Sequence, residues 1–299
     1  GLGLGLQALA REPTLACADA PPDKFSFLPG FESIVNTIGP GSFDLVIGLD
    51  SSDPLRLGHV YETDHLAGVP LINIDHHVTN LYFGDVNLVD TGAASTAEII
   101  LNLLDHLGVS IDDDGTPNKM GIASCLLTGI VTDTLSFRTS NVTPRVLKAA
   151  LRLVEAGASL AHVTHYAFNQ RPLNELSVLA VGLGRLQTEA GLAWSEISLA
   201  DRYACGDRGN GDAGLVGMLA RTKEVRIAAV FTEKENNQVE ISFRADPGFD
   251  VSQLALSLGG GGHPAAAGCT VEGPLEAVQA RVLPMMRATL EKQRKSNRP

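Results

Sequence analysis

The residues best suited to chemistry are Asp75, His76 and His77, three consecutive metal-competent side chains that follow the apolar stretch 69–74. In an open parallel sheet, ligands bind at the carboxyl ends of the strands, which is where this triplet falls. Adjacent side chains of an extended chain point to opposite sides, so one imidazole can bind a metal while the other faces a substrate. A single histidine is more often structural, but packing does not explain three such residues. We therefore expect a functional site here.

Two further carboxylates occupy comparable positions. Asp50 ends the apolar stretch 43–49, and Asp133 follows the apolar helical stretch 119–131. Either residue alone is more often a helix cap or a turn residue. Together with the histidines, however, they form a carboxylate and imidazole set. Such a set suits Mn²⁺ or Mg²⁺ better than an ion that prefers thiolates.

A second candidate site begins with the four glycines 259–262, followed by His263 and Pro264. A glycine run alone is more often a flexible loop, but glycines also let successive N–H groups approach and bind an anion. We expect Pro264 to open a short helical turn that favours the same anion. Upstream, Ser242 and Arg244 share the polar face of a predicted strand, and the Arg244 guanidinium is suited to a forked phosphate contact.

The elements that must position these residues indicate an α/β protein with two domains. In the first, apolar strands alternate with helical periods over 94–107 and 119–131, which predicts a parallel sheet with helices on both faces. The second domain is smaller and mixed α/β, with predicted strands over 191–198, 225–233 and 238–245. The predicted boundaries are 1–172 for the first domain, 173–189 for a helical connector and 190–299 for the second domain.

Composition excludes several classes of protein. The chain has 299 residues with a net charge of −11, and residues 1–118 carry 17 acidic but only three basic residues. This acidic half of the chain is poorly suited to binding along a long nucleic acid, because such binding needs many Lys and Arg side chains that contact phosphates. The longest uncharged apolar run, 121–131, is much shorter than the roughly 20 residues of a membrane span. Four widely spaced cysteines argue against disulfides and for buried thiols in a reducing, cytoplasmic setting.

Several segments together resemble the DHH phosphoesterase family with its C-terminal DHHA1 domain, and most of all its group of bifunctional oligoribonucleases and PAP phosphatases. The matching segments are Ile74–His77, Val131–Thr134, Ser242–Arg244 and Gly259–Gly268. The resemblance implies two Mn²⁺ ions, with Asp50 as a shared ligand and His76 and Asp133 as further ligands. It also implies that Asp75 orients a histidine and that His77 faces the scissile phosphate. The substrate phosphate would be held by residues of the second domain: Ser242, Arg244, Gly260, Gly261, Gly262 and His263.

The function implied by the resemblance is Mn²⁺-dependent hydrolysis of short oligoribonucleotides, of 3′,5′-bisphosphate nucleotides (pAp), or of both. A homodimer is the assembly that we consider for it. A cyclic dinucleotide phosphodiesterase shares these motifs and remains an alternative. The family's first motif, a His followed by two Asp, is absent from the sequence, and we expect the parent protein to carry it upstream of residue 1. A non-catalytic nucleotide-binding homologue that lacks this motif is the alternative from another class.

Overall fold

The computed structural model describes residues 1–39, 41–62, 64–111, 117–207 and 211–296. The chain forms two compact units, Gly1–Gln170 and Arg171–Pro299, here called unit 1 and unit 2. The stretch expected as a connector, 173–189, contains helix α6 (Leu173–Gly184) and strand β6 (Gln187–Glu189), both in unit 2.

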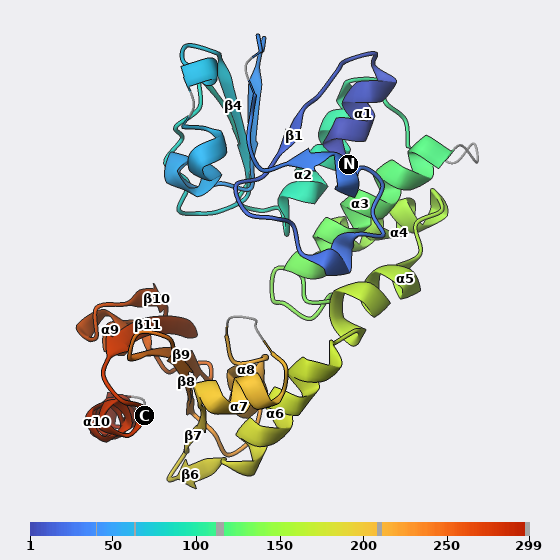
Figure 1. Ribbon diagram of the computed structural model, residues 1–299. Helices are drawn as coiled ribbons and strands as arrows, with labels where there is room; N and C mark the ends of the chain where they lie inside the picture. Colours follow the sequence, from blue (N-terminus) through green and yellow to red (C-terminus); the bar gives the residue numbers. More distant parts are fainter. Residues whose placement is uncertain (40, 63, 112–116, 208–210, 297–299) are drawn as a thin grey trace. The chain divides into compact units, whose positions relative to one another are not determined.

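Unit 1 is built around a three-stranded parallel sheet, which confirms the type of sheet that the sequence predicted (Figure 1). Its strands are β3 (Val46–Leu49), β4 (Leu71–Asp75) and β5 (Val86–Val89), in that spatial order. The central strand β4 is the most buried of the three, because neighbouring strands and both faces of the sheet shield it from solvent. Strand β5 was not predicted, because Val86 is exposed and four residues carry little periodic signal.

Helices cover both faces of this sheet. On one face, Ile47 and Ile74 pack into a core with α2 (Thr96–His106) and α3 (Pro117–Asp133). On the other, the short 3₁₀ helix η3 (Pro54–Val60) approaches Gly48 through the Leu57 side chain. The remaining elements of unit 1 are α1 (Leu2–Ala8), β1 (Leu15–Ala16), β2 (Ile34–Val35), α4 (Pro144–Glu155), α5 (Leu160–Thr164), the 3₁₀ helices η1 (Asp23–Phe25), η2 (Phe31–Ser33) and η4 (Asp64–Leu66), and the π-helical turn η5 (His165–Asn169).

Unit 2 is the expected mixed α/β unit, with a six-stranded sheet in the order β10-β11-β9-β8-β7-β6. Only β7 and β8 are parallel. One core lies between the sheet and helices α9 and α10, and a second lies on the opposite face with α6 and α8. The new elements are β7 (Leu192–Ile197), α7 (Leu199–Ala204), α8 (Leu215–Ala220), β8 (Ile227–Lys234), β9 (Gln238–Ala245), α9 (Ser252–Ser257), β10 (Gly261–His263), β11 (Ala266–Glu272) and α10 (Leu275–Ser296).

The glycine-rich segment folds differently from the prediction. Strands β10 and β11 pair as an antiparallel hairpin in which His263 faces Ala266, so only Pro264 and Ala265 remain for the turn. Two residues are too few for a helical turn, and the expectation that Pro264 opens one is wrong. Glycine is required at Gly260, since a Cβ there would lie 2.1 Å from a backbone oxygen of β11.

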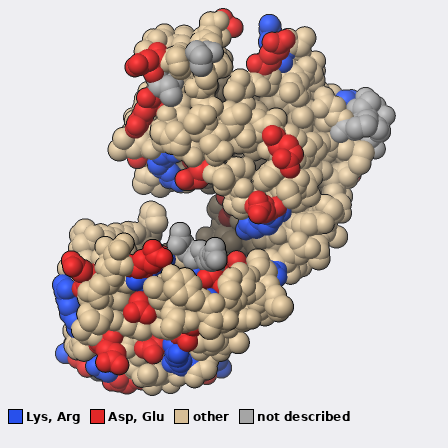
Figure 2. Space-filling model, viewed as in Figure 1, with Lys and Arg blue, Asp and Glu red and all other residues tan. Residues whose placement is uncertain are grey.

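The four cysteines are all free, as the sequence indicated. Cys269 is buried, and burial raises the pKa of its thiol to about 11. Cys17 is exposed, because it follows the short, poorly covered strand β1, and Cys125 and Cys205 are only partly buried. The expectation of four buried thiols is therefore correct at Cys269 alone. Across the described residues, no helix is both long enough and apolar enough to cross a membrane. Figure 2 shows basic and acidic side chains interspersed over the visible face of unit 2.

Candidate metal and phosphate sites

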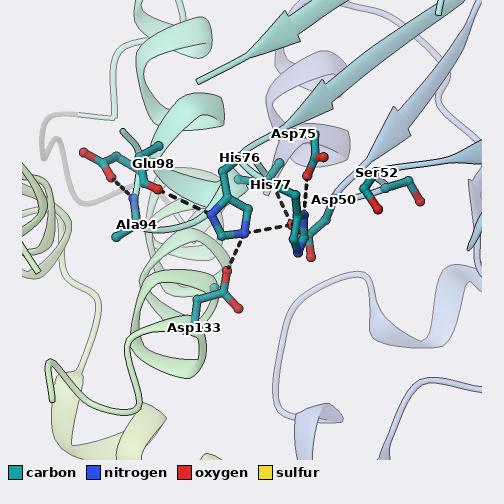
Figure 3. Close-up of polar contacts among 12 residues, drawn as sticks. Asp50, Ser52, Asp75, His76, His77, Ala94, Glu98 and Asp133 are labelled. Atoms are coloured by element: carbon teal, nitrogen blue, oxygen red, sulfur yellow. Dashed lines mark hydrogen bonds and ion pairs between the residues drawn. The ribbon is translucent and has the colours of Figure 1, made fainter. Parts of the chain in front are cut away.

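Asp50, His76 and His77 meet at the carboxyl ends of two neighbouring parallel strands in unit 1 (Figure 3). One potential ligand atom of each residue lies within 4.8 Å of the others. His76 Nε2 is 3.4 Å from Asp50 Oδ1, and His77 Nδ1 is 4.0 Å from the same oxygen. The strand register explains the convergence: Leu49 pairs with Ile74, so the residues that follow β3 and β4 leave the sheet side by side.

Asp133 reaches the same cluster from the C-terminal end of α3. Its Oδ2 lies 3.5 Å from His76 Nε2. Burial, with the nearby Asp50 carboxylate as a second cause, raises the pKa of Asp133 above its ordinary value. Both causes disfavour the ionised form, and a cation held between the two carboxylates would offset both. The donor set of two carboxylates and two imidazoles therefore fits a hard or borderline metal ion.

The turn after α3 holds an unusual backbone conformation. Leu135, Ser136 and Phe137 all have positive φ, at 46°, 62° and 62°. Each such residue costs roughly 1–2 kcal/mol when it carries a side chain. The buried Thr134 stabilises the turn, since its hydroxyl donates to the Ile130 carbonyl at 2.7 Å and accepts the Phe137 N–H at 3.1 Å. Strain of this kind concentrates at functional sites, which agrees with the position of the turn beside the cluster.

Asp75 does not reach the cluster itself but holds His77 in place. The Asp75 side chain is fully buried, and its Oδ1 accepts a hydrogen bond from His77 Nδ1 at 2.7 Å. The amide of Asn80 donates to Asp75 Oδ2 at 2.6 Å. Burial is the largest single influence on the pKa of Asp75 and raises it, but the hydrogen bonds from Asn80 and His77 outweigh burial, and the net pKa is lowered. Asp75 is thus an anion that fixes the tautomer of His77.

Hydrogen bonds also fix the orientation of Asp50 and His76. Asp50 has a left-handed backbone with φ of 58°, and Thr96 at the start of α2 donates to its Oδ1 at 2.7 Å. His76 Nδ1 donates to the Ala93 carbonyl at 3.4 Å. Because a carbonyl only accepts, Nδ1 carries the proton and Nε2 faces the carboxylates with a free lone pair. That is the tautomer in which a histidine binds a metal through Nε2.

The loop before α2 is anchored by a buried charge. Glu98 Oε2 accepts the Ala94 N–H at 2.8 Å, and Arg145 Nε donates to Glu98 Oε1 at 2.5 Å. Only 1% of Glu98 is exposed, so its charge depends on this pairing.

The sequence prediction missed the supporting roles of Thr96 and Asn80. Thr96 lies at the start of the helical period predicted over 94–107, whereas Asn80 lies in a loop with no periodic pattern.

The predicted phosphate-binding residues of unit 2 lie on adjacent strands. Arg244 of β9 pairs with Ala266 of β11, and Ser242 pairs with Gly268. Both polar side chains point to the sheet face opposite α9 and α10, since the alternate residues of β9 are buried against those helices. Gly260 directly precedes β10. Strand β10 consists of Gly261, Gly262 and His263, and it is exposed. It pairs with residues 266–268 of β11, the same stretch that pairs with Ser242 and Arg244 on the other side.

Known proteins resemble this chain over nearly its full length. The DHHA1 domain model matches residues 209–292. The bifunctional oligoribonuclease and PAP phosphatase NrnA of Thermus thermophilus is 34% identical over 298 residues, covering 97% of this chain and 84% of that protein. The Bacillus subtilis protein of the same name is 28% identical over 91% of this chain and 84% of its own length. An exopolyphosphatase-related protein from Bacteroides fragilis has the same fold, with a TM-score of 0.83, 21% identity, and coverage of 97% of this chain and 86% of that one.

The fold, the DHHA1 match and these relatives define an α/β phosphoester hydrolase, which confirms the class that the sequence predicted. Within that class, the chain belongs to the NrnA family of bifunctional oligoribonucleases and PAP phosphatases.

Proposed function

We propose that the chain is a Mn²⁺-dependent phosphoesterase acting on short oligoribonucleotides, on the bisphosphate nucleotide pAp, or on both. The observation that carries the proposal is the cluster of Asp50, His76 and His77, whose ligand atoms lie within 4.8 Å of one another, with Asp133 beside His76. The two substrate classes are those in the names of the Thermus and Bacillus relatives.

In this proposal, Asp50, His76 and Asp133 hold the metal. Their hydrogen-bonded orientation matches that role, since His76 offers Nε2 while its Nδ1 proton is engaged by a carbonyl. When bound, Mn²⁺ supplies a water of lowered pKa and neutralises charge on phosphate oxygens. In the described part of the chain no cysteine joins the cluster, which is consistent with an ion that prefers oxygen and nitrogen.

His77 is assigned to the substrate phosphate. Its Nδ1 proton is held by Asp75, so its Nε2 accepts a proton in the neutral state or donates one when the ring is protonated. About a third of the His77 side chain, 32%, is exposed, so the ring is accessible. The hydrogen bond to Asp75 fixes the ring at Nδ1 and leaves Nε2 available to a phosphate oxygen.

In unit 2, the residues assigned to the nucleotide phosphate are Arg244 and Ser242 together with Gly260, Gly261, Gly262 and His263. What supports the assignment is their common place on neighbouring strands and the exposure of β10. A guanidinium binds a phosphate through two parallel N–H donors. The glycines have no side chain, so a phosphate oxygen can come close to the backbone.

The test compares two histidine variants in a Mn²⁺-dependent hydrolysis assay with pAp and the diribonucleotide pApA as substrates. His76→Gln is expected to lower kcat/KM by at least a hundredfold on both, because it removes a ligand. His106→Gln is the matched control, since His106 is exposed at the end of α2 and bonds only the Asn102 carbonyl of its own helix. Equal activity of the two variants would contradict the proposal, as would the absence of Mn²⁺-dependent turnover in the unmodified chain.

A further inference from the structure

The segment 90–96, which runs from the residue after β5 to the first residue of α2, orients two of the proposed metal ligands. Its Ala93 carbonyl accepts the Nδ1 proton of His76 at 3.4 Å. Its Thr96 hydroxyl donates to Asp50 Oδ1 at 2.7 Å. Because both contacts come from one short stretch of chain, the positions of the two ligand side chains depend on the conformation of that stretch.

Side-chain packing holds this segment only weakly. Residues 92–95 are Gly, Ala, Ala and Ser, whose small side chains bury little apolar area. A backbone bond fixes the first half, where the Ala93 N–H donates to the Asp90 carbonyl at 3.1 Å. In the second half, the Asn141 amide donates to the Ala94 carbonyl over a longer 3.3 Å. The conformation of the segment therefore depends on its polar contacts.

Arg145 of α4 links the two ends of this segment. Its Nε donates to Glu98 Oε1 at 2.5 Å, and its Nη2 lies 3.0 Å from Asp90 Oδ2. Glu98 Oε2 in turn accepts the Ala94 N–H at 2.8 Å. The guanidinium, the Glu98 carboxylate and the Ala94 N–H thus form one continuous chain of hydrogen bonds. Figure 3 shows Glu98 and Ala94 beside His76.

The Glu98 end of this link is buried and the Asp90 end is exposed. Only 1% of Glu98 is exposed, so removing its cation leaves a buried carboxylate uncompensated. The protein relieves such a charge by protonating it, by admitting water or by moving the carboxylate. Each of these changes alters the hydrogen bond to the Ala94 N–H. The Asp90 side chain is 42% exposed, and its ion pair contributes less.

A second ion pair between the same two helices provides a comparison. Arg152, one heptad after Arg145, pairs with Asp105 through bonds of 2.5 and 2.7 Å. Asp105 likewise comes one heptad after Glu98. This pair joins α2 to α4 near their C-terminal ends, whereas the segment leads into the N-terminal end of α2. Packing of α2 on α4 explains Arg152, but it does not explain why Arg145 reaches beyond α2 to Asp90.

We propose that Arg145 is a positioning residue for the proposed metal site, because it holds the segment that orients His76 and Asp50. The inference rests on the proposed function, since it concerns the affinity for the Mn²⁺ ion of that proposal. Arg145 acts through the Glu98 carboxylate and the Ala94 N–H and not by contact with the ion. Loss of a residue that contacts a metal ligand directly lowers metal affinity by about 10–100-fold. Arg145 is further removed from the ligands, so we expect an effect of about tenfold.

The test measures Mn²⁺ binding without turnover. Electron paramagnetic resonance of the free Mn²⁺ ion gives the Kd of the 299-residue chain and of Arg145→Gln, which removes the charge. We expect the Kd to rise about tenfold in this variant. Arg152→Gln is the matched control, because it removes the other ion pair between α2 and α4, and its Kd is expected to stay within about twofold of wild type. Circular dichroism checks that each variant is folded.

Arg145→Lys is a second variant, which tests the role of Arg145 whether or not Arg145→Gln folds. Lysine keeps the positive charge beside Glu98, but its single ammonium lacks the fixed fork of donors that reaches both Glu98 and Asp90. We expect a partial rescue, with a Kd about threefold above that of wild type. If Arg145→Gln does not fold, a wild-type Kd in Arg145→Lys overturns the proposal.

An unchanged Kd for Mn²⁺ in a folded Arg145→Gln overturns the proposal, and so does an absence of Mn²⁺ binding by the wild-type chain. Equal weakening in Arg152→Gln also overturns it, because the effect would then come from the packing of α2 on α4 in general. A separate assay of pAp hydrolysis with Mn²⁺ tests the proposed function alone. Turnover by the wild-type chain with an unchanged Kd in Arg145→Gln refutes the positioning role only. A Kd about tenfold weaker in Arg145→Gln, without turnover by the wild-type chain, refutes the phosphoesterase only.

Discussion

Replacing Asn80 by alanine tests the residues that support the proposed metal site without removing a proposed ligand. Asn80 is 8% exposed, and its amide nitrogen lies 2.6 Å from Asp75 Oδ2, 2.8 Å from Asn73 Oδ1 and 3.1 Å from the Ser51 carbonyl. Its Oδ1 accepts the Tyr82 N–H at 2.7 Å. The substitution therefore removes one hydrogen-bond partner from the buried Asp75 carboxylate and one from the Tyr82 N–H.

The cost follows from the kind of bond lost. A hydrogen bond to a charged group contributes about 1.5–3 kcal/mol and a neutral one about 1 kcal/mol. We expect Asn80→Ala to lower the free energy of opening of β4 by about 3 kcal/mol, since the two losses fall in one small network. That corresponds to roughly a hundredfold in the opening equilibrium. The pKa of Asp75 is expected to rise at the same time, because the Asn80 bond is one of those that lower it.

Hydrogen exchange followed by mass spectrometry reads this out by segment. Peptides covering β4 are expected to exchange up to a hundredfold faster in Asn80→Ala, while peptides from β8 in unit 2 keep their rates. Asn102→Ala is the matched control, since Asn102 is an exposed residue of α2. If β4 in Asn80→Ala exchanged within threefold of the wild-type rate, Asn80 would not be supporting the buried carboxylate and the reasoning would be wrong.

Two further outcomes follow from unit 2. The pKa of Asp201 is lowered: burial, the largest single influence, raises it, but hydrogen bonds from Ser198 and Arg185 outweigh burial. The stabilisation by the Asp201 carboxylate is present above its ordinary pKa of 3.8 and is lost as the pH falls through the lower pKa of the folded state. In urea unfolding, we therefore expect the difference in free energy of unfolding between wild type and Asp201→Asn to become smaller from pH 7 to pH 3. Gly260→Ala places a Cβ 2.1 Å from the Gly268 oxygen and should cost about 1–3 kcal/mol, seen as faster hydrogen exchange in β10 and β11. An unchanged exchange rate there would show that the hairpin adjusts without cost.

Local sequence patterns were sufficient for the main elements and for the convergence at the cluster. The apolar stretches before Asp50 and Asp75 have the composition and length of buried strands, and they form β3 and β4. Because parallel neighbours end at the same edge of a sheet, the prediction that Asp50 and His76 approach each other needed only those two strands. The α2 and α3 periods were equally clear, since their apolar faces cover that sheet.

Contacts that depend on loop conformation and on strand register could not be predicted from local sequence patterns. Asn80 is connected to Asp75 by a turn with no periodic signal, and the hairpin at Gly262 depends on pairing with β11 rather than on any local preference. A pocket in unit 2 is lined both by Arg221 and Lys223 after α8 and by Arg244 at the end of β9, which are more than twenty positions apart in the chain. Side-chain periodicity reports which face of an element is buried, whereas only packing in three dimensions decides which buried or charged groups meet.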